Sequence, residues 1–201
     1  AINYALTSFI GTGGTRGKSK SITKFYPRTF NMGMHRKIYE KIGGMSQLRR
    51  AEDLDYAIRI YNAGFSVGLI EDAVVYHKRR SNLRKFYKQI YNWGVGRINL
   101  GRMYAEMLKP IHLVPAFLLL ILLVTIGLSI VNHIFRQILL VEAIGAVAVA
   151  FFAFFQSLGR YRSPYVSLLS IVTLFVQVLA YAMGTWKGIW YWMIRKPTSE
   201  G

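Results

Sequence analysis

The sequence predicts an α/β domain followed by a transmembrane region of about three α-helices. Three observations support this. Residues 1–110 hold 20 basic and 7 acidic residues, whereas residues 111–201 hold 6 and 2 and contain the long apolar runs. The 201-residue chain is 53% hydrophobic and 17% charged, which is more apolar than a soluble domain of this size needs. Helix-like and strand-like patterns alternate in the first half.

The composition excludes several classes of site. The chain contains no cysteine, so it has no disulfide framework, thiolate metal site or cysteine nucleophile, and redox chemistry is not expected. Residues 1–10 do not resemble a targeting segment. The net charge of +17 indicates anionic partners. Lipid headgroups are favoured over nucleic acid, because none of the standard nucleic-acid recognition motifs occurs.

The first half begins with a glycine-rich basic loop and two helices. Residues 11–20 are expected to form a flexible surface loop, because the phosphate-binding fingerprints fail at Thr12 and Arg16. Residues 35–42 predict a short helix closed by a Gly-Gly pair. Residues 51–63 place Leu54, Ile58 and Tyr61 at helical spacing and predict the clearest helix of this half.

Two short β-branched runs, residues 65–70 and 73–76, then predict strands or one strand with a turn, which completes the α/β pattern. A longer helix follows from Ser81, with Ser81 or Asn82 as its cap. It either lies at an anionic membrane surface or packs on its own domain, and the pattern leaves both open. The glycines inside this helix are expected to bend or fray it. Its apolar positions are Leu83, Phe86, Ile90, Trp93 and Ile98.

The second half predicts three membrane spans, because each apolar run is long enough to cross a hydrocarbon layer of about 30 Å. The chain thus divides into residues 1–107 and 108–201. Glu142 interrupts the second run near one end, where it is expected to reach the headgroups or a partner helix. The spans lie near residues 113–131, 138–158 and 165–186.

The orientation follows from the positive-inside rule. The basic first half and the loop 159–163, with Arg160 and Arg162, are expected in the cytoplasm. Three spans would place the C-terminal tail outside, whereas Lys187 and the basic tail argue against this, so the side of the tail stays open. The expectation is an integral protein of a bacterial inner or plasma membrane.

A series of short motifs lies between Phe25 and Arg97. They are an Asn/Gly-containing stretch, a helix ending in Gly-Gly, a Glu-Asp pair followed by Arg and Ala-Gly, a histidine at a strand end, and a Gln-x-x-x-Trp string. The residues are Asn31–Met34, Gly43, Gly44, Glu52, Asp53, Arg59, Ala63, Gly64, His77, Gln89 and Trp93. In this order they resemble the C-terminal half of a membrane-anchored family 2 glycosyltransferase, the inverting GT-A enzymes that use nucleotide-diphosphate sugars.

The resemblance implies a partial GT-A catalytic domain in which Asp53 is the general base. Inversion at an anomeric carbon requires the acceptor hydroxyl to lose its proton as it attacks, and a placed aspartate is a competent base. Glu52 would shape the acceptor site or hold Asp53. The alternative is that these carboxylates have no catalytic role and only interact favourably with the dipole at the N-terminus of the helix. The basic residues that could offset charge on the leaving diphosphate are Arg49, Arg50, Lys78, Arg79 and Arg80.

The same resemblance assigns acceptor binding to Asn31, Gln89 and Trp93, with Trp93 stacking on a sugar, and a metal contact to His77. A neutral imidazole can ligate Mg²⁺ or Mn²⁺ beside carboxylates. Asn92 stands where the family motif has arginine. This departure and the small number of spans favour transfer of a single sugar to a lipid-linked or saccharide acceptor, within polysaccharide biosynthesis.

The donor-binding half is missing, and no Asp-x-Asp metal motif occurs except Asp53-Leu54-Asp55, which lies in the Glu-Asp segment. The resemblance therefore implies a hexosyltransferase-type enzyme. Either this chain is a fragment of it or another chain supplies the missing half, and the chain by itself is expected to be inactive. The competing hypothesis is a non-catalytic membrane adaptor whose basic domain binds anionic lipid, motivated by the charge of the first half. A steep salt dependence and indifference to nucleotide sugars would distinguish the adaptor.

Overall fold

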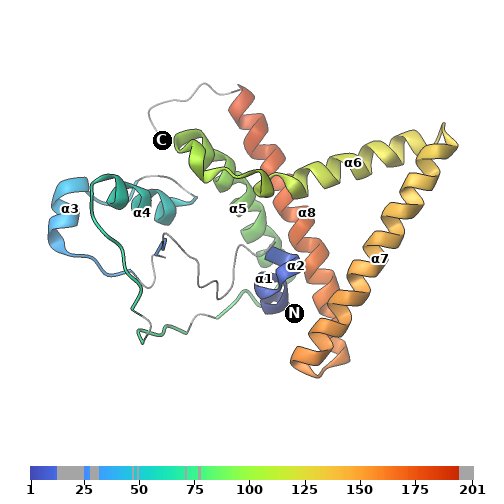
Figure 1. The fold of residues 1–201 in the computed structure, drawn as a ribbon, viewed down its shortest axis with the longest axis horizontal. Helices are drawn as coiled ribbons and strands as arrows, with labels where there is room; N and C mark the ends of the chain where they lie inside the picture. Colours follow the sequence, from blue (N-terminus) through green and yellow to red (C-terminus); the bar gives the residue numbers. More distant parts are fainter. Residues whose placement is uncertain are drawn as a thin grey trace.

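The computed structural model describes residues 1–12, 25–27, 32–46, 48, 50–70, 72–76 and 78–194. It is 75% helical. The described α-helices are α1 (Ile2–Thr7), α2 (Phe9–Thr12), α3 (Arg36–Ile42), α4 (Glu52–Asn62), α5 (Leu83–Met103), α6 (Val114–Ser129), α7 (His133–Tyr161) and α8 (Pro164–Ile194). Two 3₁₀ turns, η2 (Ala105–Met107) and η3 (Pro110–His112), connect α5 to α6. In Figure 1, α5 runs beside α8, with α3 and α4 to one side and the α6–α7 pair extending to the other.

The predicted α/β fold is wrong, because the described part of the chain forms no strand and is therefore not an α/β GT-A domain. Residues 65–70 and 72–76 are irregular, and Tyr76 is 96% exposed. A strand needs a neighbouring strand to satisfy its backbone N–H and C=O groups. No other described segment supplies one, so Ile70, Val74 and Val75 stay exposed to solvent.

The predicted helices of the first half are confirmed. His35 caps α3 by accepting a hydrogen bond from the backbone N–H of Lys37, and Gly43 ends the helix with a φ of 73°. Asn82 caps α5 through its side-chain oxygen. Of the glycine-rich loop 11–20, only Gly11 and Thr12 lie within the described residues.

The apolar face of the long helix α5 packs on α8, which belongs to the second half of the chain. Phe86 and Ile90 are fully buried in one cluster with Ala180 of α8. The helix also runs unbroken through its glycines, contrary to the expected fraying. A Cβ at Gly94 would stand 2.4 Å from the Tyr181 carbonyl oxygen, and a Cβ at Gly184 would stand 2.0 Å from that of Tyr91. These glycines bring the two backbones into direct contact.

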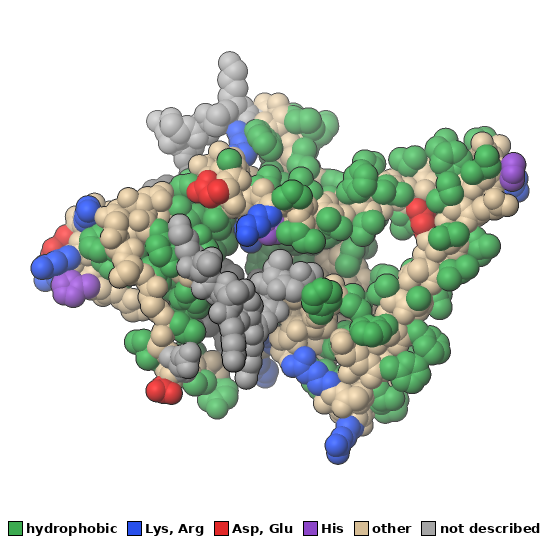
Figure 2. Space-filling model, in the orientation of Figure 1, with side chains coloured by type: hydrophobic (Ala, Val, Ile, Leu, Met, Phe, Trp, Pro, Cys, Tyr) green, Lys and Arg blue, Asp and Glu red, His purple; other side chains and the backbone are tan. Residues whose placement is uncertain are grey.

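Helices α7 and α8 are long and apolar enough to cross a membrane, whereas α6 has 16 residues and is shorter. Hydrophobic side chains cover the α6 and α7 arms in Figure 2. Helix α6 lies within the first range predicted for a span, whereas α7 and α8 include the second and third ranges and extend beyond them. Glu142 lies between α6 and α7, where it accepts a hydrogen bond of 3.2 Å from Thr125.

The first twelve residues pack against α7 and α8, an arrangement that their sequence does not indicate. Tyr4 donates a hydrogen bond of 2.8 Å to Gln156, and Arg160 donates one of 3.0 Å to Thr7. Gln177 of α8 donates to the carbonyl of Gly11. Helices α1 and α2 are thereby held beside the α5–α8 pair.

Candidate functional site

A cavity of about 890 Å³ lies where α4, α5, α6 and α8 meet. Four of the six site residues expected from the sequence line it: Glu52, Asp53, Gln89 and Trp93. Asn31 and His77, the other two, lie outside the described residues. The cavity thus brings together a carboxylate pair and the Gln-x-x-x-Trp string from segments more than thirty positions apart in the sequence.

The two carboxylates lie in the first turn of α4, after a strained residue. Ala51 has a φ of 63°, in the left-handed region that costs a non-glycine residue about 1–2 kcal/mol. Asp53 accepts a hydrogen bond of 2.9 Å from the backbone N–H of Leu54. A Cβ at Gly96 would stand 3.2 Å from the Cβ of Arg50, so the glycine makes room for this turn on α5.

A side-chain pair also ties the turn to α5. The Nε of Arg50 donates a hydrogen bond of 3.0 Å to the Oδ1 of Asn92, and both residues line the cavity. Asn92 occupies the position where the resemblance described above leads one to expect arginine. The structure therefore brings a guanidinium to this place from the turn before α4 instead of from α5.

The cavity is strongly basic. Five basic side chains line it against two carboxylates, so its formal charge favours an anionic ligand. Burial, together with the charges of Arg97 and Lys109, lowers the pKa of His112 to about 4, so this cavity residue is neutral at pH 7. The basic residues are Arg50, Arg80, Lys85, Lys88 and Arg97.

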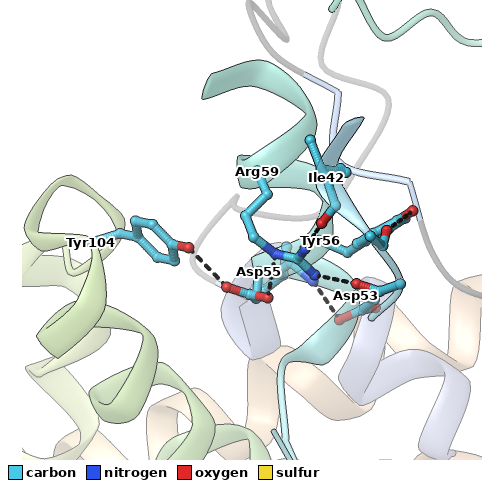
Figure 3. A network of polar contacts seen from close by, with 9 residues as sticks. Ile42, Asp53, Asp55, Tyr56, Arg59 and Tyr104 are labelled. Carbon is cyan, nitrogen blue, oxygen red and sulfur yellow. Dashed lines mark hydrogen bonds and ion pairs between the residues drawn. The ribbon is translucent and has the colours of Figure 1, made fainter. Parts of the chain in front are cut away.

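A buried ion pair outside the cavity holds α4 in place (Figure 3). Asp55 is 1% exposed; its Oδ2 lies 3.1 Å from Arg59 Nε, and its Oδ1 accepts a hydrogen bond of 2.8 Å from Tyr104. Arg59 also donates to the carbonyls of Ile42 and Gly44 at 2.9 and 2.8 Å. Burial and the bond to Asp55 raise the pKa of Tyr104 to about 12. The network joins the end of α3, helix α4 and the end of α5.

The described residues do not fit a divalent metal. No group of three His, Asp or Glu side chains is gathered among them. The Asp53-Leu54-Asp55 sequence is no metal pair, because both oxygens of Asp55 bond Arg59 or Tyr104.

Comparison with known proteins decides the family. The profile described as "Glycosyl transferase family group 2" matches residues 25–194, which is most of the chain. The chain belongs to this glycosyltransferase family. It is also similar to "Probable glycosyltransferase YdaM" of Bacillus subtilis (strain 168), with 29% identity over 66 residues. That match covers 33% of this chain and 16% of the relative, so the chain spans a small part of the relative's length. No solved structure matches the chain.

Membership of this family supports a role in glycosyl transfer. Glycosyltransferases of family 2 often use a divalent metal. Several cavity residues are not among the candidates expected from the sequence. Of the five basic candidates, Arg50 and Arg80 line the cavity, Lys78 and Arg79 do not, and Arg49 lies outside the described residues. Their spacing along the sequence could have indicated that Lys85, Lys88 and Asn92 belong to the cavity, because residues three or four positions apart lie on one helix face.

Proposed function

We propose that this glycosyltransferase is a membrane-bound, inverting enzyme that transfers a sugar from a nucleotide-diphosphate sugar to a lipid-linked or saccharide acceptor. The observation that carries the proposal is the cavity shared by Asp53, Glu52, Gln89 and Trp93. If the carboxylate pair only interacted with the helix dipole, it would not need to share a basic cavity with the Gln-x-x-x-Trp string.

In this mechanism Asp53 takes the proton of the acceptor hydroxyl as its oxygen attacks the anomeric carbon. The new carbon–oxygen bond forms on the face opposite the old one, and the nucleoside diphosphate leaves with the electron pair. Basic side chains of the cavity offset the charge that develops on the leaving group. Trp93 supplies a face on which a sugar ring stacks, and Gln89 supplies hydrogen bonds to its hydroxyls.

The donor nucleotide is held by a further part of the protein in this proposal. The curated relative is several times longer than the segment that matches, and no group of three metal-ligating side chains is found among the described residues. We expect the 201-residue chain alone to show no sugar transfer. The hexosyltransferase type and a role in polysaccharide synthesis belong to the same proposal.

The proposed location is a bacterial inner or plasma membrane, with the catalytic part on the cytoplasmic side. Helices α7 and α8 have the length and composition for membrane spans. Arg160 and Arg162 lie at the turn between them, where the positive-inside rule favours the cytoplasmic side. The similarity to a protein of Bacillus subtilis supports the proposal that the membrane is a bacterial one.

The test replaces Asp53 by Asn in the full-length protein in lipid nanodiscs. Release of nucleoside diphosphate is measured with a panel of UDP-, GDP- and dTDP-sugars and a membrane-lipid extract as acceptor source. Asp53→Asn is expected to lower kcat by at least a hundredfold, the order that a general base contributes. Asp72→Asn, which changes an exposed carboxylate outside the cavity, is the matched control. Near-normal turnover by Asp53→Asn would overturn the mechanism.

A further inference from the structure

The cavity changes character along α5. Gln89 and Trp93 are followed one turn later by Arg97, and the neighbouring His112 belongs to η3, directly before α6. From the sugar-binding pair onward, this wall presents Arg97 with the neutral His112 and then an apolar helix, whereas Lys85 and Lys88 lie on the other side of the pair. That sequence of surfaces matches a ligand with a sugar, an anionic group and a hydrocarbon chain, joined in that order.

The cationic part is built from both walls. Arg50 lies beside Gly96 and is held by Asn92, and Arg97 donates a hydrogen bond of 3.2 Å to the carbonyl of Met107. The Nδ1 of His112 accepts a hydrogen bond of 3.0 Å from the backbone N–H of Lys109. Because this ring is neutral at pH 7, its proton lies on Nε2, which makes it a third donor.

An apolar track leads away from these donors. Ile111, Val114 and Leu118 line the cavity, and Ile121 continues the same spacing of three or four residues beyond it. All four side chains are between 37% and 54% exposed. A row of exposed aliphatic side chains on a helix of this composition suits an alkyl or prenyl chain.

We propose that the acceptor is a saccharide carried on a membrane lipid through a phosphate or diphosphate. The phosphate lies among Arg50, Arg97 and His112, the hydrocarbon chain follows Ile111 to Ile121, and the sugar reaches Trp93 and Asp53. This assignment rests on the proposed function, because it takes the cavity as the place of transfer. Guanidinium groups suit phosphate oxygens, to which they donate paired hydrogen bonds.

Binding is tested without any donor, with the full-length protein in nanodiscs and a long-chain prenyl phosphate as the probe. The dissociation constant is measured by native mass spectrometry. We expect the prenyl phosphate to bind at least tenfold more tightly than the corresponding prenyl alcohol, and inorganic pyrophosphate to compete only weakly. Equal binding of alcohol and phosphate, equal binding of pyrophosphate, or equal binding of phosphatidic acid would each overturn the proposal.

Variants locate the site. Arg50→Gln is expected to weaken binding about tenfold, and adding Asn92→Arg is expected to restore it, because the cation returns to the same place from α5. Arg84→Gln, on the same helix but outside the cavity, is the control and should bind as the unaltered protein does. Arg50→Gln with unchanged affinity would refute the headgroup assignment, and thermal unfolding checks that each variant is folded.

The tail is tested by a matched pair on α6. Leu118→Asn should weaken prenyl phosphate binding several-fold, because it puts an amide in the apolar track. Phe117→Asn changes a more exposed side chain outside the cavity and should have no effect. Equal effects of the two changes would refute the track. Asp53→Asn should bind the probe normally, so loss of lipid binding and failure of the catalytic mechanism are recognised separately.

Discussion

The glycine contacts between α5 and α8 lead to the most demanding prediction. A Cβ at Gly184 would stand 2.0 Å from the Tyr91 carbonyl oxygen. Since a close carbon–oxygen contact measures about 3.3 Å, Gly184→Ala would force the two helices apart by about 1.3 Å at this point. Overpacking of this kind lowers the free energy of unfolding by up to about 3 kcal/mol, and the better helix propensity of alanine offsets about 1 kcal/mol of this loss.

The expected net loss is therefore about 2 kcal/mol, which corresponds to a fall in Tm of about 4–8 °C for a cooperative unit of 150–250 residues. The assay is thermal unfolding of the full-length protein, followed by tryptophan fluorescence. Gly145→Ala in α7 is the matched control, because nothing lies within 4 Å of its Cβ position. It should leave Tm unchanged or raise it. A Gly184→Ala protein as stable as Gly145→Ala would refute the direct backbone contact.

Two further predictions concern ionisable groups. Asp55→Asn should destabilise the protein by about 2 kcal/mol in denaturant unfolding, because Arg59 loses a buried partner. Glu40→Gln breaks the exposed pair with Arg36, at the same spacing, and should cost under about 0.5 kcal/mol; equal effects would contradict the burial argument. The pKa of His112 is lowered from 6.5 to about 4, so between these values the unfolded chain binds more protons and stability falls as pH falls. His112→Gln should remove this part of the pH dependence, and an unchanged profile would show that the folded protein does not hold the ring neutral.

The helices were predictable from sequence because their determinants are local. Residues 51–63 combine a helical apolar period with acidic residues in the first turn, and α4 covers Glu52–Asn62. Residues 35–42 end at a glycine that takes a positive φ. Each signal lies within one or two turns of the helix that it predicts, so a single sequence contains it.

The prediction of strands was wrong because strand formation depends on residues far away in the sequence. The runs 65–70 and 73–76 have the composition of strands, but composition does not say whether a second segment is present to pair with them. The glycines of α5 carry the same lesson. In isolation Gly94 indicates a weak helix, whereas beside α8 it permits a close approach that a side chain would prevent.

The candidate site was predictable only in part. The Glu-Asp pair and the Gln-x-x-x-Trp string were identified by their order along the chain, and the structure brings them to one cavity. The bond between Arg50 and Asn92 joins residues 42 positions apart, and no local pattern indicates it. The sequence alone shows asparagine at position 92, where arginine is expected. The fold shows that the guanidinium of Arg50 binds this asparagine.

The packing of α5 on α8 gives the cavity its mixed character. Helix α5 carries Gln89, Trp93 and Arg97, and its glycine contacts with α8 hold it against an apolar helix long enough to cross a membrane. Because α6 begins at the same cavity, polar recognition groups and aliphatic side chains share one wall of it. A change in the α5–α8 spacing would move the sugar-binding residues relative to the apolar track. Gly184→Ala should therefore impair lipid phosphate binding as well as stability, whereas Gly145→Ala should impair neither.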